Sequence, residues 1–416
     1  MPEAPRPANG GARGVRAALL FLGLRRSIVG LLAMVVLVGL GEKLAERFLP
    51  LYLVTLGGGA LSIGLLNGLD NFLSAVYSHV GGQLSQRLGI KRALLLFNGL
   101  AATGFLVVVA VPSWPAVLAA SALFLSWSAI SLPASMELVG RERPADRRVM
   151  GVSMHSLTRR VPMALGPILG GLMIDRLGVE AGVRTAFALA ALLAGVAAVF
   201  QTRLIRDDRA LGATPPPGGA RALWRVMGRP LKALLAADVL VRYCEHIPYA
   251  FVVIWAMETI QRPVSATAFG MLTAVEMLTA FAVYLPVAYF ADRGRKKPFV
   301  VVTFGFFTLF PLALLVSHSF WPLVAAFVVR GLKELGEPTR KAMIFELAPE
   351  GRKAASFGLY YLVRDVIVSL GALGGAWLWA LDPALNLIVA ALFGVAGTLL
   401  FALAGREPAP PEEPAT

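Results

Sequence analysis

The sequence has little charge and almost no cysteine. Only 15% of its 416 residues are Asp, Glu, Lys or Arg, and Cys244 is its one cysteine. A single thiol excludes an intrachain disulfide and a cysteine-rich metal site within one chain. No motif for a nucleotide, for zinc or for a nucleophile with its base is present, and the four histidines are scattered singly. We therefore expect no enzyme, no cofactor and no metal site.

The abundant residues are apolar. Hydrophobic side chains make up 57% of the chain and its mean hydropathy is +0.70, outside the range of ordinary soluble domains. A net charge of +14 is typical of nucleic-acid binders, but here the arginines fall between long apolar runs and not on one solvated face. The composition predicts a lipid bilayer around the chain and no nucleic-acid partner.

Apolar windows of about 20 residues, the length that crosses the hydrocarbon core, recur along the whole chain. Six precede the middle of the sequence and six follow it, so we expect an all-α polytopic membrane protein with twelve transmembrane helices. The windows are 28–55, 61–86, 93–111, 114–138, 149–175, 181–202, 233–258, 264–290, 298–317, 321–346, 353–381 and 383–404.

The two halves of the sequence are similar to each other. An offset of 205 residues places Arg159 on Arg364 and Gly166 on Gly371. This period is far too long for a solenoid repeat. It indicates two pseudo-symmetric bundles of six helices, an arrangement typical of secondary transporters.

Positive charge and proline define the expected domains. Arginine and lysine gather in the N-terminal arm, in the loops after helices 2, 4, 8 and 10, and in a central linker that contains Pro215. By the positive-inside rule these segments and both termini are cytoplasmic, and we expect the protein in the cell membrane. The domains are a basic arm (1–26), an N-terminal bundle (27–202), a cytoplasmic linker (203–232), a C-terminal bundle (233–404) and a cytoplasmic tail (405–416).

Several charged side chains fall inside the apolar windows, where each costs about 2.5 to 3.5 kcal/mol unless it is paired or hydrated. They must face one another or an aqueous path, either as gates and helix contacts or as a binding site. Helical spacing predicts that Arg330 pairs with Glu334 and Lys333 with Glu337. The candidates for a central charge network or substrate site are Arg159, Arg160, Arg242, Arg330, Lys333, Glu337, Arg364 and Asp365.

Buried carboxylates are candidates for carrying a proton. Burial disfavours the ionised form of a carboxylate and a nearby arginine favours it, so a proton and a cationic partner can compete for one site. An offset of 206 residues brings Asp70 onto Glu276, and we expect these two to occupy matching places in the halves. The proton-coupling candidates are Glu42, Glu46, Asp70, Glu245, Glu276 and Glu334.

A loop motif occurs in both halves. The first copy reads Gly-Gln-Leu-Ser-Gln-Arg-Leu-Gly-Ile-Lys-Arg from Gly82, and the second, one residue shorter, contains Asp292. They resemble the Gly-x-x-x-Asp-Arg-x-Gly-Arg-Arg loop of the major facilitator superfamily, with Gln86 in place of the usual aspartate. The resemblance extends over roughly residues 26 to 404 and implies a loop that latches the bundles on the cytoplasmic side. The residues that carry it are Gly82, Gln86, Arg87, Gly89, Asp292, Arg293 and Gly294.

A second similarity lies in expected helix 5, where Gly166, Pro167, Gly170 and Gly171 are similar to the end of a motif found in proton-coupled antiporters of that superfamily. Small residues at this spacing also let helices pack closely without any role in coupling. The superfamily resemblance further implies that helices 1, 4, 7 and 10 line a central cavity. The charged residues on helices 1, 7 and 10 agree with this.

Together these observations predict a monomeric secondary active transporter that moves a small molecule by alternating access. The leading hypothesis is proton-coupled export of an amphipathic or cationic compound. The alternative is proton-coupled import of an anionic metabolite, because guanidinium groups bind carboxylate or phosphate. The arginines that favour it are Arg159, Arg160, Arg242, Arg330 and Arg364. A hypothesis of a different class is an intramembrane enzyme or a receptor that transports nothing.

Overall fold

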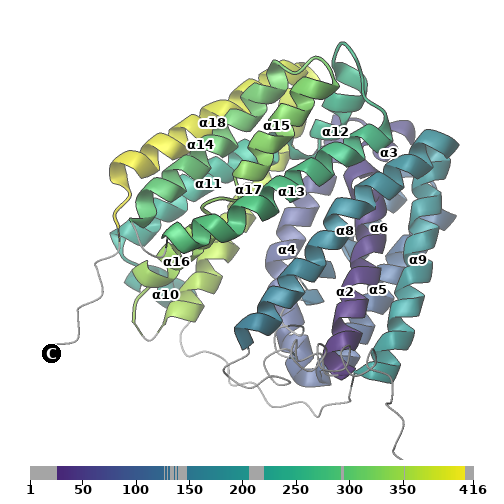
Figure 1. Cartoon of the computed structure of the whole chain (residues 1–416), viewed down its shortest axis with the longest axis horizontal. Coiled ribbons are helices and arrows are strands. Elements are labelled where there is room, and N and C mark those ends of the chain that lie inside the picture. Colours follow the sequence, from purple (N-terminus) through teal and green to yellow (C-terminus); the bar gives the residue numbers. More distant parts are fainter. Residues whose placement is uncertain are drawn as a thin grey trace, which may run out of the picture.

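The structure is a computed structural model that describes residues 26–125, 127–128, 130–131, 135, 138, 148–205, 220–291, 295–350 and 352–407. Within these ranges the regular elements are helices and no strand occurs. Figure 1 shows the helices gathered in two bundles, one from each half of the chain. The expected all-α fold of two bundles is confirmed.

The first half of the chain forms the bundle that Figure 1 colours purple to teal. Its described elements are α2 (Arg26–Ala45), η1 (Glu46–Phe48), α3 (Leu49–Thr55), α4 (Ala60–Leu88), α5 (Ile90–Ala110), α6 (Trp114–Phe124), α8 (Arg148–Leu177) and α9 (Val179–Leu204). Those of the second half are α10 (Ala220–Val226), α11 (Arg229–Tyr249), α12 (Val252–Ile254), η3 (Trp255–Thr259), α13 (Ala266–Ala291), α14 (Lys296–Leu315), α15 (Phe320–Leu332), α16 (Glu337–Leu347), α17 (Lys353–Leu381) and α18 (Pro383–Ala404).

Among the described helices, six are long and apolar enough to cross a bilayer, in α5, α9, α13, α14, α17 and α18. A seventh span results if α11 is counted with the bent segment that follows it. The expected windows 93–111, 181–202 and 383–404 agree with α5, α9 and α18 to within a few residues. The windows 264–290, 298–317 and 353–381 correspond to α13, α14 and α17, and the other windows contain charges or breaks, which lower their hydropathy or divide them into shorter helices.

Short turns connect several helices. α4 passes into α5 at Gly89 and α8 into α9 at Gly178, where φ angles of 84° and 82° are readily adopted only by glycine. At the start of α18, Oδ1 of Asp382 accepts hydrogen bonds from the N–H groups of Ala384 and Leu385 at 2.6 and 3.1 Å. Such turns reverse the chain within a few residues, so consecutive helices lie antiparallel.

Three of the expected helices are interrupted. The first consists of α2, the 3₁₀ turn η1 and α3; the seventh bends by 47° after α11, next to Pro248; the tenth is divided into α15 and α16. At the last break the N–H of Gly336 donates a hydrogen bond to Oγ1 of Thr303 at 2.6 Å, which satisfies one freed backbone group. Each break occurs beside charged residues and so places polar groups in the interior.

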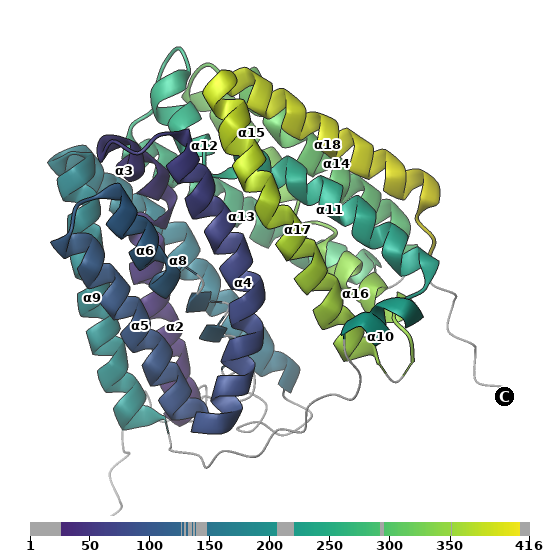
Figure 2. The same ribbon diagram turned by 180° about the vertical axis from the view of Figure 1, so that it is seen from behind.

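The two bundles touch along two helix pairs, α8 with α13 and α4 with α17. Glycine permits this approach: a Cβ added at Gly171 would overlap the carbonyl of Ala266, and one at Gly64 would lie 2.5 Å from Cβ of Ala376. In Figures 1 and 2 the bundles lie close together near α3 and α12 and diverge toward the end that carries α10. The bundles are therefore held together more closely at one end than at the other.

Apolar side chains cover the outer faces of α5, α9, α14 and α18. Large exposed examples are Leu106, Leu192, Val302 and Leu392. Exposed apolar surface on so many helices is unfavourable in water and suits contact with lipid. The structure thus agrees with a multi-pass membrane protein.

Candidate functional site

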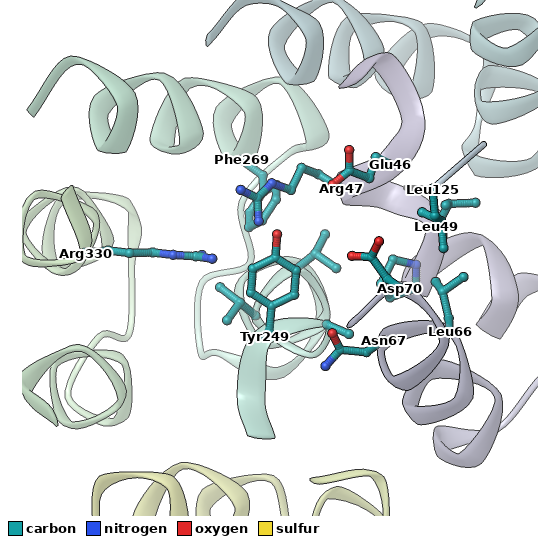
Figure 3. A pocket seen from close by; sticks show the side chains of 14 residues that line it. Glu46, Arg47, Leu49, Leu66, Asn67, Asp70, Leu125, Tyr249, Phe269 and Arg330 are labelled. Atoms are coloured by element: carbon teal, nitrogen blue, oxygen red, sulfur yellow. The ribbon is translucent and has the colours of Figure 1, made fainter. Parts of the chain in front are cut away.

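A pocket lies between the bundles and is lined by both. Figure 3 shows Tyr249, the last residue of α11, near its centre, with Arg330 of α15 on one side and Asp70 of α4 on the other. Arg47 of η1 points toward the same ring. The lining residues are Glu46, Arg47, Leu49, Pro50, Leu66, Asn67, Asp70, Leu125, Tyr249, Ala250, Val252, Val253, Phe269 and Arg330.

Two guanidinium groups flank the aromatic ring. Cζ of Arg47 lies 5.1 Å and Cζ of Arg330 lies 5.4 Å from the ring centroid of Tyr249, within the range of cation–π contacts. Nε of Arg330 also lies 3.1 Å from Oε1 of Glu276, and both of these side chains are only 3% exposed. Arg47, in contrast, forms no salt bridge or hydrogen bond through its side chain with a described residue. Its acidic electrostatic neighbours are Glu276, Glu46 and Glu245.

Hydrogen bonds between the bundles border this pocket. Nδ2 of Asn67 on α4 donates to the carbonyl of His246 on α11 at 2.9 Å. Nδ2 of Asn71, one turn further along α4, lies 3.0 Å from Nδ1 of the same histidine. A movement that separates α4 from α11 must break both contacts.

Glu245 is held by two cations. Its carboxylate lies 2.6 Å from Nη1 of Arg242 on the same helix and 2.6 Å from Nζ of Lys333, just after α15. Nζ of Lys333 also lies 3.6 Å from Oε1 of Glu276. A continuous chain of ion pairs therefore joins α11, α13 and α15 and reaches the pocket at Arg330.

A second group of charges surrounds Asp238, whose side chain is 1% exposed. It pairs with the equally buried Arg340 of α16, accepts a hydrogen bond from the hydroxyl of Tyr360 at 3.0 Å, and lies 3.4 Å from Nη1 of Arg364. Glu337 lies 2.7 Å from Nη2 of Arg340. Because each of these charges has lost hydration, removing one partner leaves an uncompensated buried charge.

Glu334 differs from the other carboxylates of this region. It lies in the turn between α15 and α16, and its electrostatic neighbours are Glu337, Lys333, Arg242 and Glu245. Arg242 connects the two groups of charges, since its Nη2 lies 3.3 Å from Oε2 of Glu337. The side chain of Glu334 forms no salt bridge or hydrogen bond with a described residue. It is a half-buried carboxylate, and no cation of the described residues lies at ion-pair distance from it.

A smaller group of charges lies in the N-terminal bundle. Glu42 of α2 lies 3.4 Å from Nζ of Lys43 and accepts a hydrogen bond from Oγ of Ser128 at 3.2 Å. Lys43 also pairs with Glu46. Arg159 of α8 lines the same small pocket as Glu42 and interacts with it electrostatically. One helix 5 arginine thus faces an acidic residue of helix 1 in the interior.

The pairs expected from helical spacing for Arg330 and Lys333 are not formed. Arg330 binds Glu276, and Lys333 binds Glu245 and Glu276, on other helices. The reason is that α15 ends at Leu332 and α16 begins only five residues later. Residues four apart share a face only within one continuous helix, and the break removes that relation.

The residues matched by the repeat lie on corresponding helices. Arg160 is half-buried on α8, while Asp365 on α17 pairs with its neighbour Arg364 at 2.7 Å. Asp70 on α4 lines the pocket, and Glu276 on α13 is buried beside it. Neither Asp70 nor Glu276 is placed on the outer surface.

The loop motif is described only in its first copy. Gly82, Gln86 and Arg87 lie in the last turns of α4, and Gly89 makes the turn into α5. The second copy lies outside the described residues, namely Asp292, Arg293 and Gly294.

The helix 5 motif lies in two interfaces. A Cβ added at Gly166 or Gly170 would overlap the backbone of α2, and one at Gly171 would overlap that of α13. The carbonyl of Pro167 lies against Gly270 of α13. Close backbone approach accounts for these residues without a role in coupling.

Sequence reasoning did not select Asp238, Arg340, Arg47 or Tyr249 as site residues. Asp238 lies four residues before Arg242, and their side chains are 3.8 Å apart, so helical spacing was a usable signal. No sequence signal places Tyr249 at the centre of the pocket, because its position depends on the bend that follows α11.

Comparison with known proteins finds similarity over most of the chain. The family model of the Major Facilitator Superfamily matches residues 31–258 and 246–416. An uncharacterized MFS-type transporter of Methanocaldococcus jannaschii is 21% identical over 378 residues, which cover 87% of this chain and 90% of that protein. A Na(+), Li(+), K(+)/H(+) antiporter of Planococcus maritimus is 31% identical over 161 residues, 36% of each chain.

Solved structures share the fold. The peptide transporter POT in complex with sulfate has a TM-score of 0.74 at 16% identity, covering 91% of this chain and 94% of that chain. A point variant of a nucleoside transporter has a TM-score of 0.74 at 14% identity, covering 91% and 100%. At these identities the likeness is one of fold.

Proposed function

The chain belongs to the Major Facilitator Superfamily, a family of membrane transporters and not of enzymes, and we propose that it is a secondary active transporter coupled to protons. In this proposal it moves a small molecule across the cell membrane by alternating access. The observation that carries the proposal is the pocket around Tyr249, which takes its lining from both bundles. A site between two bundles that rock against each other opens to each side in turn.

The moving bodies in this proposal are residues 27–202 and 233–404, joined by the linker 203–232, with the arm 1–26 and the tail 405–416 in the cytoplasm. The turn between α4 and α5, with Arg87 and Lys91, lies at the end where the bundles diverge in Figure 2. Basic turns favour the cytoplasmic side. We therefore assign that end to the cytoplasm and the observed arrangement to an inward-facing state.

Proton coupling is supported by the position of Glu334. Its electrostatic neighbours are two carboxylates, Glu337 and Glu245, and two cations, Lys333 and Arg242. Because these opposing charges sit on α11, on α16 and in the turn after α15, a small relative movement of these segments changes which influence is stronger. A carboxylate in such a position can take up a proton in one state and release it in the other.

For direction, we propose export of an amphipathic compound in exchange for protons. The named activity of the Planococcus maritimus relative, exchange of cations for protons, supports antiport. The pocket joins apolar walls such as Leu66 and Phe269 to charged groups, which supports an amphipathic solute. Import of an anionic metabolite is the second candidate, because the guanidinium groups of Arg47 and Arg330 line the pocket and such groups bind carboxylate or phosphate.

The test is transport by the purified protein in liposomes that contain a pH-sensitive dye. Solutes are first selected by a thermal-shift screen, because a ligand that binds only the folded state raises the melting temperature. An antiporter should make the lumen of acid-loaded liposomes more alkaline as solute enters. A symporter should move solute and protons across the membrane in the same direction. If selected solutes cross without any proton flux, the coupling is wrong; if none crosses, transport itself is wrong.

A further inference from the structure

We propose that α10 and the turn that follows it form a docking surface for anionic phospholipids of the membrane. The headgroup phosphates bind Arg221, Arg225 and Arg229, and Trp224 lies at the boundary between headgroups and acyl chains. This inference concerns a surface outside the pocket around Tyr249 and goes beyond the proposed transport function. It gives the segment before α11 a task of its own, which is to hold the start of the C-terminal bundle against the lipid surface.

The charge of this segment has one sign. Residues 220–232 include Arg221, Arg225, Arg229 and Lys232 and no acidic residue. The three arginines are exposed, and none of them forms a salt bridge or hydrogen bond through its side chain with a described residue. Several positive charges are therefore available together to an anionic surface outside the chain.

Apolar contacts determine which side of α10 faces outward. Leu223 and Met227 are buried in the apolar core of the C-terminal bundle, which includes Tyr360 of α17. A step of two residues along a helix turns by about 200°, so Arg221 and Arg225 lie opposite these two anchors. The packing of α10 on the bundle thus turns both guanidinium groups away from the protein.

The position of α10 brings this surface to the boundary of the bilayer. Only two residues separate the end of α10 from the start of α11 at Arg229. α10 also packs on α17, and Figure 2 shows it beside the starting end of that helix. The apolar span of α17 begins at Ser356, three residues after the helix starts, a rise of about 4.5 Å. The arginines therefore lie within a few residues of the edge of the hydrocarbon, at the depth of the headgroups.

Exposed apolar side chains favour lipid over a soluble acidic partner. Trp224 is 39% and Val226 47% exposed, on either side of the arginines. Nζ of Lys232 lies 5.2 Å from the ring centroid of Trp224, a cation–π contact. Indole rings and basic side chains occur together where a protein meets the headgroups, because one end of each is apolar and the other is wet. Basic segments beside a membrane span are attracted by anionic lipids of the cytoplasmic leaflet.

The experiment uses the purified full-length protein in detergent micelles that contain phosphatidylglycerol or phosphatidylcholine with brominated acyl chains. Bromine quenches tryptophan fluorescence at short range, and the difference between the wild type and Trp224→Phe isolates the signal of Trp224. Brominated phosphatidylglycerol should half-quench this signal at a mole fraction about tenfold lower than brominated phosphatidylcholine. High salt should remove the difference, because salt screens exposed charges. Water-soluble glycerol phosphate at the same concentration should not displace the lipid.

The charge variant is Arg221→Gln with Arg225→Gln, and its matched control is Arg176→Gln with Arg262→Gln. Both pairs remove two exposed arginines, but the control pair lies at the opposite end of the bundles, where α8 ends and α13 begins. The charge variant should need at least tenfold more phosphatidylglycerol for half-quenching, and the control should need as much as the wild type. If Trp224→Phe does not fold, the rise in melting temperature that each lipid causes in the two arginine variants decides.

The failures are distinguishable from one another. Equal quenching by the two lipids, a preference for phosphatidylglycerol that survives in the charge variant, or displacement of the lipid by glycerol phosphate overturns the lipid surface and leaves the transport function standing. A preference that depends on Arg221 and Arg225, in a protein that moves no solute in liposomes, supports the lipid surface and overturns only the proposed transport function.

Discussion

The carboxylate of Asp175, near the end of α8, accepts a hydrogen bond from the backbone N–H of Ala266 at 2.9 Å, across the boundary between the bundles. Its second oxygen accepts one from the N–H of Thr267 at 2.9 Å. These N–H groups open α13 and have no partner within that helix. A residue of one bundle thus caps a helix of the other, and the cap exists only while the bundles touch at this end.

Asp175→Ala should shift the protein toward the state in which this end is open. Loss of a cap costs about 1 kcal/mol, which changes the ratio of two states about fivefold. Spin labels on Leu177→Cys and Gln261→Cys report the distance between the bundles. The native Cys244 is buried and should not react with the label. We expect longer label-to-label distances in Asp175→Ala than in the wild type. The control Glu180→Ala, which removes an exposed acid nearby, should leave these distances unchanged. Identical distance distributions in Asp175→Ala and the wild type would show that the cap does not hold the bundles together.

Glu334→Gln should separate solute movement from proton movement. The amide cannot ionise, so the variant should still exchange solute for solute across a liposome membrane but lose accumulation driven by a pH gradient. A decrease of at least tenfold in gradient-driven uptake is expected. Glu180→Gln, on the exposed start of α9, serves as the control and should behave like the wild type. Full gradient-driven uptake by Glu334→Gln would assign the proton to another carboxylate.

The ion pair of Arg330 and Glu276 should matter for folding as well as for the pocket. Replacing Glu276 by Gln leaves a buried guanidinium whose nearest carboxylate is gone, and breaking a buried pair in this way costs about 3 to 5 kcal/mol. The melting temperature of the variant in detergent should therefore fall by several degrees. The double variant with Arg330→Met should recover part of this loss. If both melt like the wild type, the pair contributes nothing to stability.

Arg159→Gln and Arg160→Gln should differ. Arg159 is the arginine that shares a pocket with Glu42, so its loss should reduce transport at least tenfold while the protein still inserts and runs as a single species on size-exclusion chromatography. Arg160→Gln should retain more of the activity. Glu42→Gln added to Arg159→Gln should restore thermal stability, because both charges are then removed together. Equal transport by the two single variants would refute this assignment.

Much of the fold follows from local properties of the sequence. The windows at 93–111, 181–202 and 383–404 became α5, α9 and α18, because a helix that crosses a bilayer needs an apolar length that can be read from the residues themselves. The repeat of one half in the other likewise predicted two bundles. Pairs within a continuous helix were also readable: Arg242 reaches Glu245 three residues on, at 2.6 Å.

Only the tertiary structure decided which charges meet between helices. Arg330 faces Glu276 and not Glu334, because a break ends α15 at Leu332, and no spacing rule states where a helix breaks or how it is rotated against its neighbours. The same holds for the pocket. Tyr249 reaches its centre, and Arg47 lies beside its ring, because separate helices bend or unwind there and bring distant parts of the chain together.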